Sequence, residues 1–369
     1  MPELVLMLPG PLGTLTGGYG YDRSIAAGLR SVGWSVTVHE LDDSFPFPTR
    51  AALDEAARVL AGVRDGTTVL IDGLALGAMA AEAEHEAARL RLVALVHHPL
   101  AAETGLDPAA ADALALSERR ALAAVRLVVV TSQATAAALA PYGVPHDRIA
   151  VIEPGTDRAP LARSYQPSLD HGASAISHQP LALLCVASLV PRKGHDVLFR
   201  ALAMIPDLAW QLTCVGSLER DVSTVERLRA QLRDAVLTDR VQLVGEMGGA
   251  GLEARYDAAD LFVLATFYEG YGMAVAEALA RGIPVVSTPT GAIGELIAGR
   301  GSSGRDRLQP DQAAGLLVPP GDAPALAAAL SRAIGDDECR GRLADGARRV
   351  RDRLPTWTDA AARMARALA

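Results

Sequence analysis

Aromatic side chains are scarce in this sequence of 369 residues, at 4%, although 50% of the residues are hydrophobic. The hydrophobic content is mostly alanine, leucine and valine, which suits helices packed on parallel strands. Only three cysteines occur and no C-x-x-C pair, which argues against a disulfide framework and favours a reducing compartment. No apolar run approaches the roughly 20 residues that span a bilayer. Any membrane contact is therefore expected to be peripheral.

The sequence also lacks an excess of basic residues, since its net charge is −8. Such a chain has no general attraction to nucleic acid or anionic lipid, so neither is an expected partner. The first residues, Met1–Leu6, are typical of a strand and have no basic region before them, which argues against a signal peptide. We predict a cytoplasmic protein, with any membrane contact at the inner face. Nothing in the sequence indicates its oligomeric state.

Short apolar runs alternate with longer helical stretches, which is the rhythm of a parallel sheet covered on both faces. The strands predicted in the first half are 4–8, 35–39, 68–72, 92–96, 127–131 and 148–152. Those predicted in the second half are 181–188, 210–216, 241–245, 261–265, 285–287 and 315–318. Residues 159–180 contain three prolines and four serines and are typical of a linker. We predict an α/β domain at 1–165, a linker at 166–180 and a second α/β domain at 181–354.

The densest motif runs from Phe267 to Ser287. A buried strand is followed by a turn with two glycines, Gly270 and Gly272, and then by a helix that Gly282 ends. A glycine turn at a helix N-terminus binds anions, because free backbone N–H groups and the helix dipole face outward. Two carboxylates beside it, Glu269 and Glu277, suit sugar and ribose hydroxyls better than phosphate. The eight-residue spacing of the two glutamates alone is weak evidence.

The whole frame, E-G-Y-G followed by E-A-x-A-x-G-x-P-V-V, resembles the motif of retaining family 4 glycosyltransferases, glycosyl transferases group 1. The order of further motifs agrees. Arg192-Lys193-Gly194 resembles the turn that presents two cations to a diphosphate. Val215-Gly216-Ser217 resembles a V-G-x-G turn, with Leu218 at the usual second glycine. Thr290–Glu295 resembles a G-G-x-P-E turn, with Ala292 and Gly294 as departures, and Gly315–Asp322 resembles a G-x-L-V-x-P-x-D segment.

The N-terminal half has two features that fit this resemblance. The glycine-rich loop Gly13–Gly20 follows the first strand, and Gly17 and Gly18 are predicted to open a helix whose N–H groups face a diphosphate. His97 ends the fourth strand, where the family places a histidine against the donor sugar, whereas His98 is expected to point to the other side.

The resemblance implies a GT-B fold of class α/β, with two Rossmann-like doubly wound parallel-sheet domains facing a cleft. The N-terminal domain would bind the acceptor, the C-terminal domain the nucleotide sugar, and the C-terminal helix at 355–369 would pack back on the N-terminal domain. The residues to which the resemblance gives catalytic roles are His97, Arg192, Lys193 and Glu269. Those to which it gives donor contacts are Gly17, Gly18, Gly216, Gly270, Tyr271, Gly272, Met273, Ala274 and Glu277.

Absent motifs narrow the expected chemistry. No D-x-D occurs, which favours transfer without a metal ion, and no cluster of cysteine and histidine has ligand spacing. No dinucleotide-type G-x-G-x-x-G directly follows a predicted strand, since the match at 299–304 falls in the predicted loop, which argues against a nicotinamide enzyme. We expect no cofactor besides a nucleotide-sugar donor, which family frequency suggests is a UDP-sugar.

Several alternatives stay open. A sugar-nucleotide epimerase or a glycosyl phosphorylase has the same architecture, and a non-catalytic nucleotide-sugar binding protein is a third candidate. The acceptor, whether a glycan, a lipid-linked sugar or a small molecule, has no diagnostic motif. Glu103 and Thr131-Ser132 are secondary site candidates, with loop polarity or helix capping as equally good explanations. The Gly-, Ser- and Arg-rich stretch 299–311 is expected to be an exposed loop.

Overall fold

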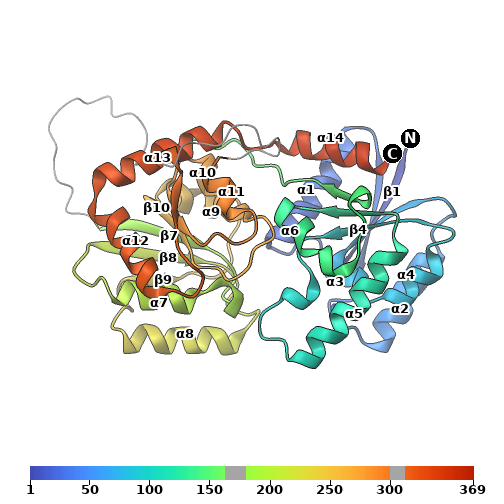
Figure 1. Cartoon of the computed structure of the whole chain (residues 1–369), viewed down its shortest axis with the longest axis horizontal. Helices are drawn as coiled ribbons and strands as arrows, with labels where there is room; N and C mark the ends of the chain where they lie inside the picture. Colours follow the sequence, from blue (N-terminus) through green and yellow to red (C-terminus); the bar gives the residue numbers. More distant parts are fainter. Residues whose placement is uncertain (163–179, 300–311) are drawn as a thin grey trace. The chain divides into compact units, whose positions relative to one another are not determined.

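The computed structural model describes residues 1–162, 180–299 and 312–369. These residues form two compact units, with Met1–Gly155 and Pro355–Ala369 in unit 1 and Thr156–Leu354 in unit 2 (Figure 1). The sequence predicts that the first domain extends to residue 165, whereas the first of the two segments of unit 1 ends at Gly155. The predicted linker at 166–180, apart from Pro180, and the predicted loop at 299–311, apart from Gly299, lie outside the described residues.

Unit 1 is a parallel sheet with helices on both faces. Its strands, in the spatial order β2-β1-β3-β4-β5-β6, are β1 (Glu3–Pro9), β2 (Ser35–Leu41), β3 (Thr68–Asp72), β4 (Arg91–Val96), β5 (Leu127–Val130) and β6 (Ile149–Val151). Its α-helices are α1 (Gly17–Ser31), α2 (Arg50–Ala61), α3 (Gly73–Leu76), α4 (Ala80–Glu86), α5 (Pro108–Ala124), α6 (Gln133–Ala138) and α14 (Trp357–Leu368). Short 3-10 turns are η1 (Leu100–Ala102), η2 (Ala140–Tyr142) and η3 (His146–Arg148).

Unit 2 repeats this architecture with a different strand order, β12-β11-β10-β7-β8-β9. Its strands are β7 (Leu181–Val186), β8 (Trp210–Val215), β9 (Val241–Leu243), β10 (Leu261–Leu264), β11 (Val285–Ser287) and β12 (Gly315–Leu317). Its helices are α7 (His195–Ala203), α8 (Val222–Asp234), α9 (Gly249–Asp257), α10 (Met273–Ala280), α11 (Ile293–Ile297), α12 (Ala323–Gly335) and α13 (Asp337–Arg351), with η5 at Pro191–Lys193. The predicted class, two doubly wound α/β domains, is confirmed.

The strand order of each sheet fixes where a ligand is expected to bind. In unit 1 the order reverses between β1 and β3, and in unit 2 it reverses between β7 and β10. In open parallel sheets, ligands bind beyond the carboxyl ends of the strands at such a switch point, because the two following connections diverge there. The loops after these four strands are therefore the first places to look for a site.

The segment after Leu354 completes unit 1. Helix α14 lies against α1 so closely that a Cβ added to Gly28 would lie 2.5 Å from the Cβ of Ala361. Met364 of α14 is fully buried, and Trp357 meets the ring of Tyr21 edge-on at 6.0 Å between centroids. Side-chain packing thus makes a distant part of the sequence an integral layer of this unit.

Each unit has its own buried core of valine, leucine, isoleucine and alanine. Parallel strands covered on both faces have nearly every side chain buried, which explains their continuous apolar runs. Phe262, Trp210 and Tyr21 are among the largest fully buried side chains. Among residues 1–162, 180–299 and 312–369, no helix is long and apolar enough to cross a membrane.

Candidate functional site

Unit 2 places an ion pair at its switch point. Lys193 ends η5, which follows β7, and Glu269 lies in the turn after β10. These two strands are neighbours in the sheet. The Nζ of Lys193 lies 2.5 Å from Oε1 of Glu269, and the two side chains are 16% and 12% exposed. Two motifs that are 76 residues apart in the sequence therefore meet at one edge of the sheet.

Arg192 joins the same two turns through its own hydrogen bonds. Its guanidinium donates to the carbonyl of Tyr268 at 2.9 Å. The carbonyl of Arg192 accepts from the N–H of Phe267 at 2.8 Å and from the hydroxyl of Thr266 at 3.1 Å. These bonds hold the turn that carries Lys193 against the turn that carries Glu269, so the ion pair is built on a fixed backbone.

Two glycines allow this close approach. Gly194 has a φ of +67°, and a Cβ there would lie 2.0 Å from the carbonyl oxygen of Ala265. Gly216, which follows β8, faces the carbonyl of Ala187 in the same way, also at 2.0 Å. No larger residue fits against a backbone at this distance. The predicted turns at Arg192–Gly194 and Gly216 are thus packed backbone to backbone beside the sheet edge.

The N-terminus of α10 has the form expected of an anion site. Its N-cap is Gly272, in the left-handed conformation at φ +97°, and no side chain caps the helix. The backbone amides of Met273 and Ala274 belong to its first turn, where N–H groups lack partners within the helix. Gly270 precedes this cap. Tyr271, which lies between these two glycines, is 5% exposed and belongs to the core of unit 2.

Glu277 lies one turn into α10 and is partly buried. The hydroxyl of Tyr256 donates to its Oε2 at 2.9 Å. Burial raises the pKa of this carboxyl, whereas the hydrogen bond from Tyr256 and the nearby Arg281 lower it. The guanidinium of Arg281 stacks over the ring of Tyr256 at 4.7 Å, which positions the phenol. In the part of the chain that the structure describes, no hydrogen bond reaches Oε1 of Glu277, so this oxygen is available to a hydroxyl donor.

The departures from the family pattern leave the turns well held. Ser217 accepts from the N–H groups of Glu219 and Arg220 at 3.3 and 3.2 Å, which fixes the turn that has Leu218 instead of glycine. In the turn where Gly294 replaces the proline, the N–H of Ile293 donates to the carbonyl of Thr290 at 3.1 Å, and the carbonyl of Gly294 accepts from the N–H of Ala298 at 3.2 Å. Asp322, the last residue of the segment Gly315–Asp322, caps α12, because its carboxylate accepts from the N–H of Ala325 at 2.8 Å. Its role is therefore structural.

Unit 1 builds a second charged cluster around His97. The residue follows β4, and its Nε2 lies 3.2 Å from Asp22 Oδ1 and 3.4 Å from Asp72 Oδ2. Asp22 comes from α1 and Asp72 ends β3, which borders the switch point. A Cβ on Gly18 would lie 3.3 Å from the His97 ring, so the glycine at the start of α1 lets the helix end approach the imidazole.

This cluster holds the imidazole in its charged form. Burial lowers the pKa of His97, but the hydrogen bonds to Asp22 and Asp72 outweigh it and raise the pKa to about 10. Burial raises the pKa of Asp22 to about 6, against the effect of His97. The carboxylates are 2% and 5% exposed, so they depend on the imidazolium for compensation. At neutral pH this site presents a fixed cation next to the N-terminus of α1.

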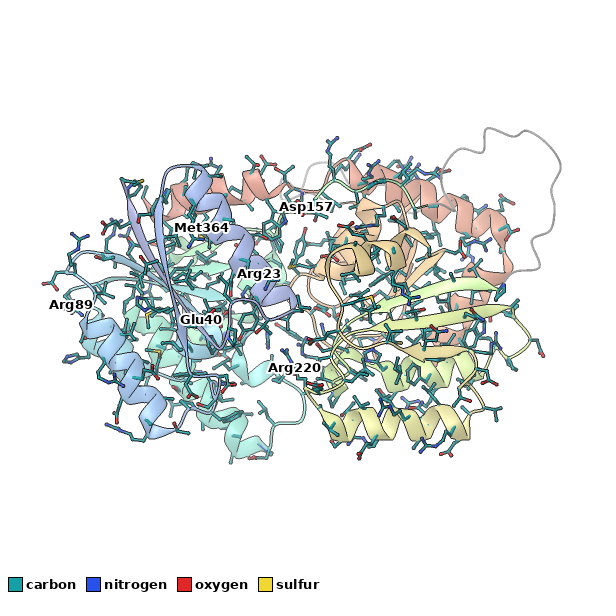
Figure 2. All side chains as sticks on the ribbon, turned by 180° about the vertical axis from the view of Figure 1, so that it is seen from behind. Arg23, Glu40, Arg89, Asp157, Arg220 and Met364 are labelled. Atoms are coloured by element: carbon teal, nitrogen blue, oxygen red, sulfur yellow. The ribbon has the colours of Figure 1, made fainter. Side chains whose placement is uncertain are left out.

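The glycine-rich loop before α1 is anchored by two charged residues (Figure 2). Arg23 donates to the carbonyls of Leu12 and Thr14 at 2.7 and 2.8 Å. Glu40 accepts from the N–H of Leu12 at 2.7 Å. Gly17 then begins the helix, with Thr16 as its N-cap. The prediction that Gly17 and Gly18 open a helix is correct.

The secondary candidates have structural explanations. Ser132 caps α6 by accepting from the N–H of Thr135 at 3.0 Å, and both Ser132 and Thr131 are buried. His98 pairs with Glu103 at 3.5 Å in a partly exposed loop, apart from the Asp22 and Asp72 pair that holds His97. Helix capping explains the contacts of Ser132, and loop polarity explains the pair of His98 and Glu103. Both explanations were given above as alternatives to a role in the site.

Asp22, Asp72 and Tyr256 were missed by the sequence reasoning. Asp22 and Asp72 are charged residues in otherwise apolar contexts, one on the buried face of a helix and one at the end of a strand. That signal was present in the sequence. The spacing of cysteine and histidine also indicated no cluster, yet Cys185, His195 and Cys214 lie together in unit 2. Contacts between separate strands and helices are invisible to a search for local spacing.

Two doubly wound α/β units in one chain are the architecture of the GT-B class of proteins, and glycine turns with charged side chains at the switch points suit ligand binding there. Comparison with known families agrees: residues 70–159 match the family described as Glycosyltransferase Family 4, and residues 180–336 match Glycosyl transferases group 1. The chain belongs to the GT-B glycosyltransferases.

Among curated proteins, the chain is 32% identical to the D-inositol 3-phosphate glycosyltransferase of Salinispora arenicola over 70% of its length. It is 28% identical to the MMP alpha-(1->4)-mannosyltransferase of Mycolicibacterium hassiacum over 86% of its length. The matched regions cover 59% and 74% of those relatives. The chain thus spans little more than half of the Salinispora relative.

Among solved structures, the sucrose-phosphate synthase of Thermosynechococcus elongatus superposes with a TM-score of 0.78 at 21% identity, covering 99% of this chain and 98% of that one. The Anabaena protein HepE, in complex with UDP and glucose, superposes with a TM-score of 0.73 at 20% identity, covering 99% and 98%. At these identities the likeness establishes the fold.

Proposed function

We propose that the chain transfers a sugar from a nucleoside-diphosphate sugar, with UDP as the favoured nucleotide, to a hydroxyl of an acceptor and with retention of anomeric configuration. The observation that carries the proposal is the partly buried pair of Lys193 and Glu269 at the switch point of unit 2, in the turn before the helix that carries Glu277. A cation, a glycine-capped helix end and two carboxylates supply what a diphosphate, a sugar and a ribose require. The relatives named as glycosyltransferases support the class of reaction.

Each residue then has a distinct task in the proposal. Lys193 and Arg192 stabilise the negative charge that develops on the leaving diphosphate, helped by the amides of Met273 and Ala274 and by the helix opened at Gly17 and Gly18. Glu277 accepts from the ribose hydroxyls and Glu269 from the hydroxyls of the transferred sugar. His97, held charged by Asp22 and Asp72, donates to the far side of that sugar.

The reaction needs no protein nucleophile in this scheme. The bond between the anomeric carbon and the diphosphate oxygen breaks while the acceptor oxygen bonds to that carbon from the same face. The acceptor proton passes to the departing phosphate oxygen. Preorganised positive charge around the diphosphate is then the main contribution to rate, because that is where charge develops. In this proposal the transfer needs no metal ion and takes place in the cytoplasm.

The alternatives require other residues to carry the chemistry. An epimerase would act on the donor alone, and a phosphorylase would release a sugar phosphate. A binding protein without activity would not need the full set of Arg192, Lys193, Glu269 and Glu277, and all four are present. Incubation with the donor alone, with and without inorganic phosphate, separates these outcomes by product.

Donor binding is tested by thermal unfolding in the presence of UDP, GDP, ADP and their sugar derivatives. A nucleotide at 100 times its dissociation constant stabilises the folded protein by about 2.7 kcal/mol. We expect a shift with UDP and its sugars that is lost in Lys193→Ala and weakened in Arg192→Ala. Arg200→Ala is the matched control, since Arg200 lies on α7 in an exposed pair with Asp196. Shifts of wild-type size in both variants would refute the assignment.

A further inference from the structure

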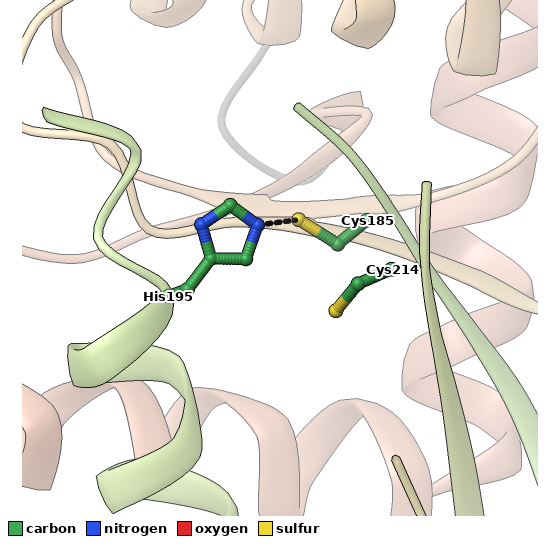
Figure 3. Close-up of side chains that lie close together, drawn as sticks. All are labelled: Cys185, His195 and Cys214. Atoms are coloured by element: carbon green, nitrogen blue, oxygen red, sulfur yellow. Dashed lines mark hydrogen bonds between the residues drawn. The ribbon is translucent and has the colours of Figure 1, made fainter. Parts of the chain in front are cut away.

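Three buried side chains below the phosphate-binding turns of unit 2 take no part in the proposed reaction. Cys185 lies near the end of β7 and Cys214 near the end of β8, at directly paired positions of neighbouring parallel strands. His195 begins α7, two residues after Lys193. The three side chains are exposed by 1%, 0% and 2%. Figure 3 shows the imidazole turned toward the two sulfur atoms.

The distances within this cluster are those of ligands around a common centre. Nε2 of His195 lies 3.7 Å from Sγ of Cys185, and the three ligand atoms all lie within 4.8 Å of one another. With bonds of about 2.3 Å to sulfur and 2.0 Å to nitrogen, a sulfur and a nitrogen ligand lie about 3.5 Å apart at the tetrahedral angle and about 3.7 Å apart at 120°. The side chains need little movement to share an ion.

The histidine has an unusually poor set of polar contacts. Among the described residues, the polar partner of its ring is Cys185, and its buried Nδ1 has no hydrogen-bond partner. A sulfur atom is a weak hydrogen-bond partner, so the contact compensates poorly for burying an imidazole. A cation bound by Nε2 would compensate better for the burial of the imidazole than the contact with sulfur does. Such a cation would explain why the imidazole faces two thiols.

The cluster offers a cation two sulfur ligands and one nitrogen ligand. The thiolate is the form that binds metal. In low dielectric, two thiolates neutralise a divalent cation, and one thiolate with one thiol neutralises a monovalent cation.

We propose that Cys185, Cys214 and His195 form a binding site for a thiophilic d10 cation, Zn²⁺ or Cu⁺, in the core of unit 2. Thiolate and imidazole ligands suit both ions. On binding, each ionising thiol releases its proton to solvent and forms a sulfur–metal bond, without any change of oxidation state. The ion joins the ends of β7 and β8 to the start of α7, and it thereby stiffens the turns that hold Lys193 and Gly216.

Metal binding by the purified chain tests the site directly. The protein is stripped of metal and titrated with Zn²⁺, or with Cu⁺ under anaerobic reducing conditions, against a chromophoric chelator. We expect one equivalent bound per chain with one of the two ions. Co²⁺ substitution should give the charge-transfer absorption of cobalt bound to thiolate.

Alanine variants of the three ligands, each alone, should lower the affinity by more than the 10–100-fold typical of outer-shell changes. Cys339→Ala is the matched control, because Cys339 is equally buried but lies in α13, outside the cluster. It should bind as wild type does. Absence of binding for both ions, or an equal loss in Cys339→Ala, would overturn the proposal.

A second measurement uses the wild-type chain, so it does not depend on a variant that folds. In mild denaturant, the bound ion should slow alkylation of Cys185 and Cys214, read peptide by peptide, and leave Cys339 unchanged. Equal slowing at all three cysteines, or none, would count against the site. Neither measurement uses a nucleotide sugar, so the result is independent of the proposed transfer reaction.

Discussion

At Glu277, a ligand-binding role and a purely structural role predict different results. If its carboxylate accepts from the ribose, Glu277→Gln should weaken UDP binding by about 10-fold or more, since hydrogen bonds to charged groups contribute about 1.5–3 kcal/mol. It should also remove most of the preference for UDP over 2′-deoxy-UDP. Calorimetric titration of both nucleotides measures this.

Tyr256→Phe is the comparison for Glu277→Gln. It removes the hydrogen bond to Oε2 but keeps the carboxylate and its Oε1, so the discrimination between UDP and 2′-deoxy-UDP should survive. A variant Glu277→Gln that still discriminated as wild type does would show that Glu277 serves the fold of α10 and not the ribose.

The pH dependence of stability should expose the cluster around His97. Its pKa is raised in the folded state to about 10, so the stabilisation from the imidazolium is fully present below about 6.5, the usual histidine value. It is lost as the pH rises through about 10. His97→Asn leaves two buried carboxylates without a cation and should cost about 3–5 kcal/mol at pH 8.

That deficit should narrow as the pH rises toward 10, because the wild type then loses the imidazolium proton and with it the stabilisation that the variant lacks. Urea unfolding of both proteins at pH 7, 8 and 10 measures the difference. His98→Asn provides the control, since His98 pairs with the partly exposed Glu103. A deficit that stays constant or grows toward pH 10 would disprove the ion-pair account of His97.

At the scale of elements, the turn between β7 and α7 should tolerate substitution worse than its backbone conformation alone predicts. Gly194 and Gly249 both have positive φ, at +67° and +53°, but a Cβ on Gly194 would meet Ala265 at 2.0 Å, whereas a Cβ on Gly249 meets nothing within 4 Å. Gly249→Ala should cost the left-handed strain, about 1–2 kcal/mol. Gly194→Ala should cost clearly more, and equal midpoints in denaturant unfolding would contradict the packing argument.

The strands and the motif-bearing turns could be predicted from sequence because their signals are local. Apolar runs between helical stretches located all twelve strands of the two sheets in the described residues. Glycines at the turns marked Gly194, Gly216 and Gly272, whose positive φ or backbone contacts exclude other residues. Such features depend on neighbours in the chain, so one sequence is enough to find them.

The partners of the site residues could not be predicted, because they depend on sheet order. Asp72 reaches His97 because β3 and β4 are adjacent, and Asp22 reaches it from α1. Tyr256 meets Glu277 from α9, and Cys185 meets Cys214 across two strands. Without the strand order, each of these residues was one polar or sulfur-bearing side chain in an apolar stretch.

For the molecule as a whole, a substitution near the C-terminus should weaken the N-terminal unit. Met364 lies in α14, is fully buried, and belongs to unit 1 (Figure 2). Met364→Ala should cost about 2–5 kcal/mol, the range for large-to-small core changes. Hydrogen exchange should accelerate in β1 to β5 and stay unchanged in β7 to β12.

Arg366→Ala is the matched control on the same helix, because its side chain is exposed. It should change stability by no more than about 0.5 kcal/mol. If Met364→Ala accelerated exchange in unit 2 instead, the assignment of α14 to unit 1 would be incorrect.

The return of α14 to unit 1 also has a consequence for synthesis on the ribosome. Residues 1–155 leave the ribosome first, but their unit lacks α14 until residues 355–369 follow. At 5–20 residues per second, translating unit 2 in between takes about 10–40 s. During that interval the face of α1 around Gly28 has no helix to cover it. The N-terminal unit therefore begins folding first but reaches its native state last.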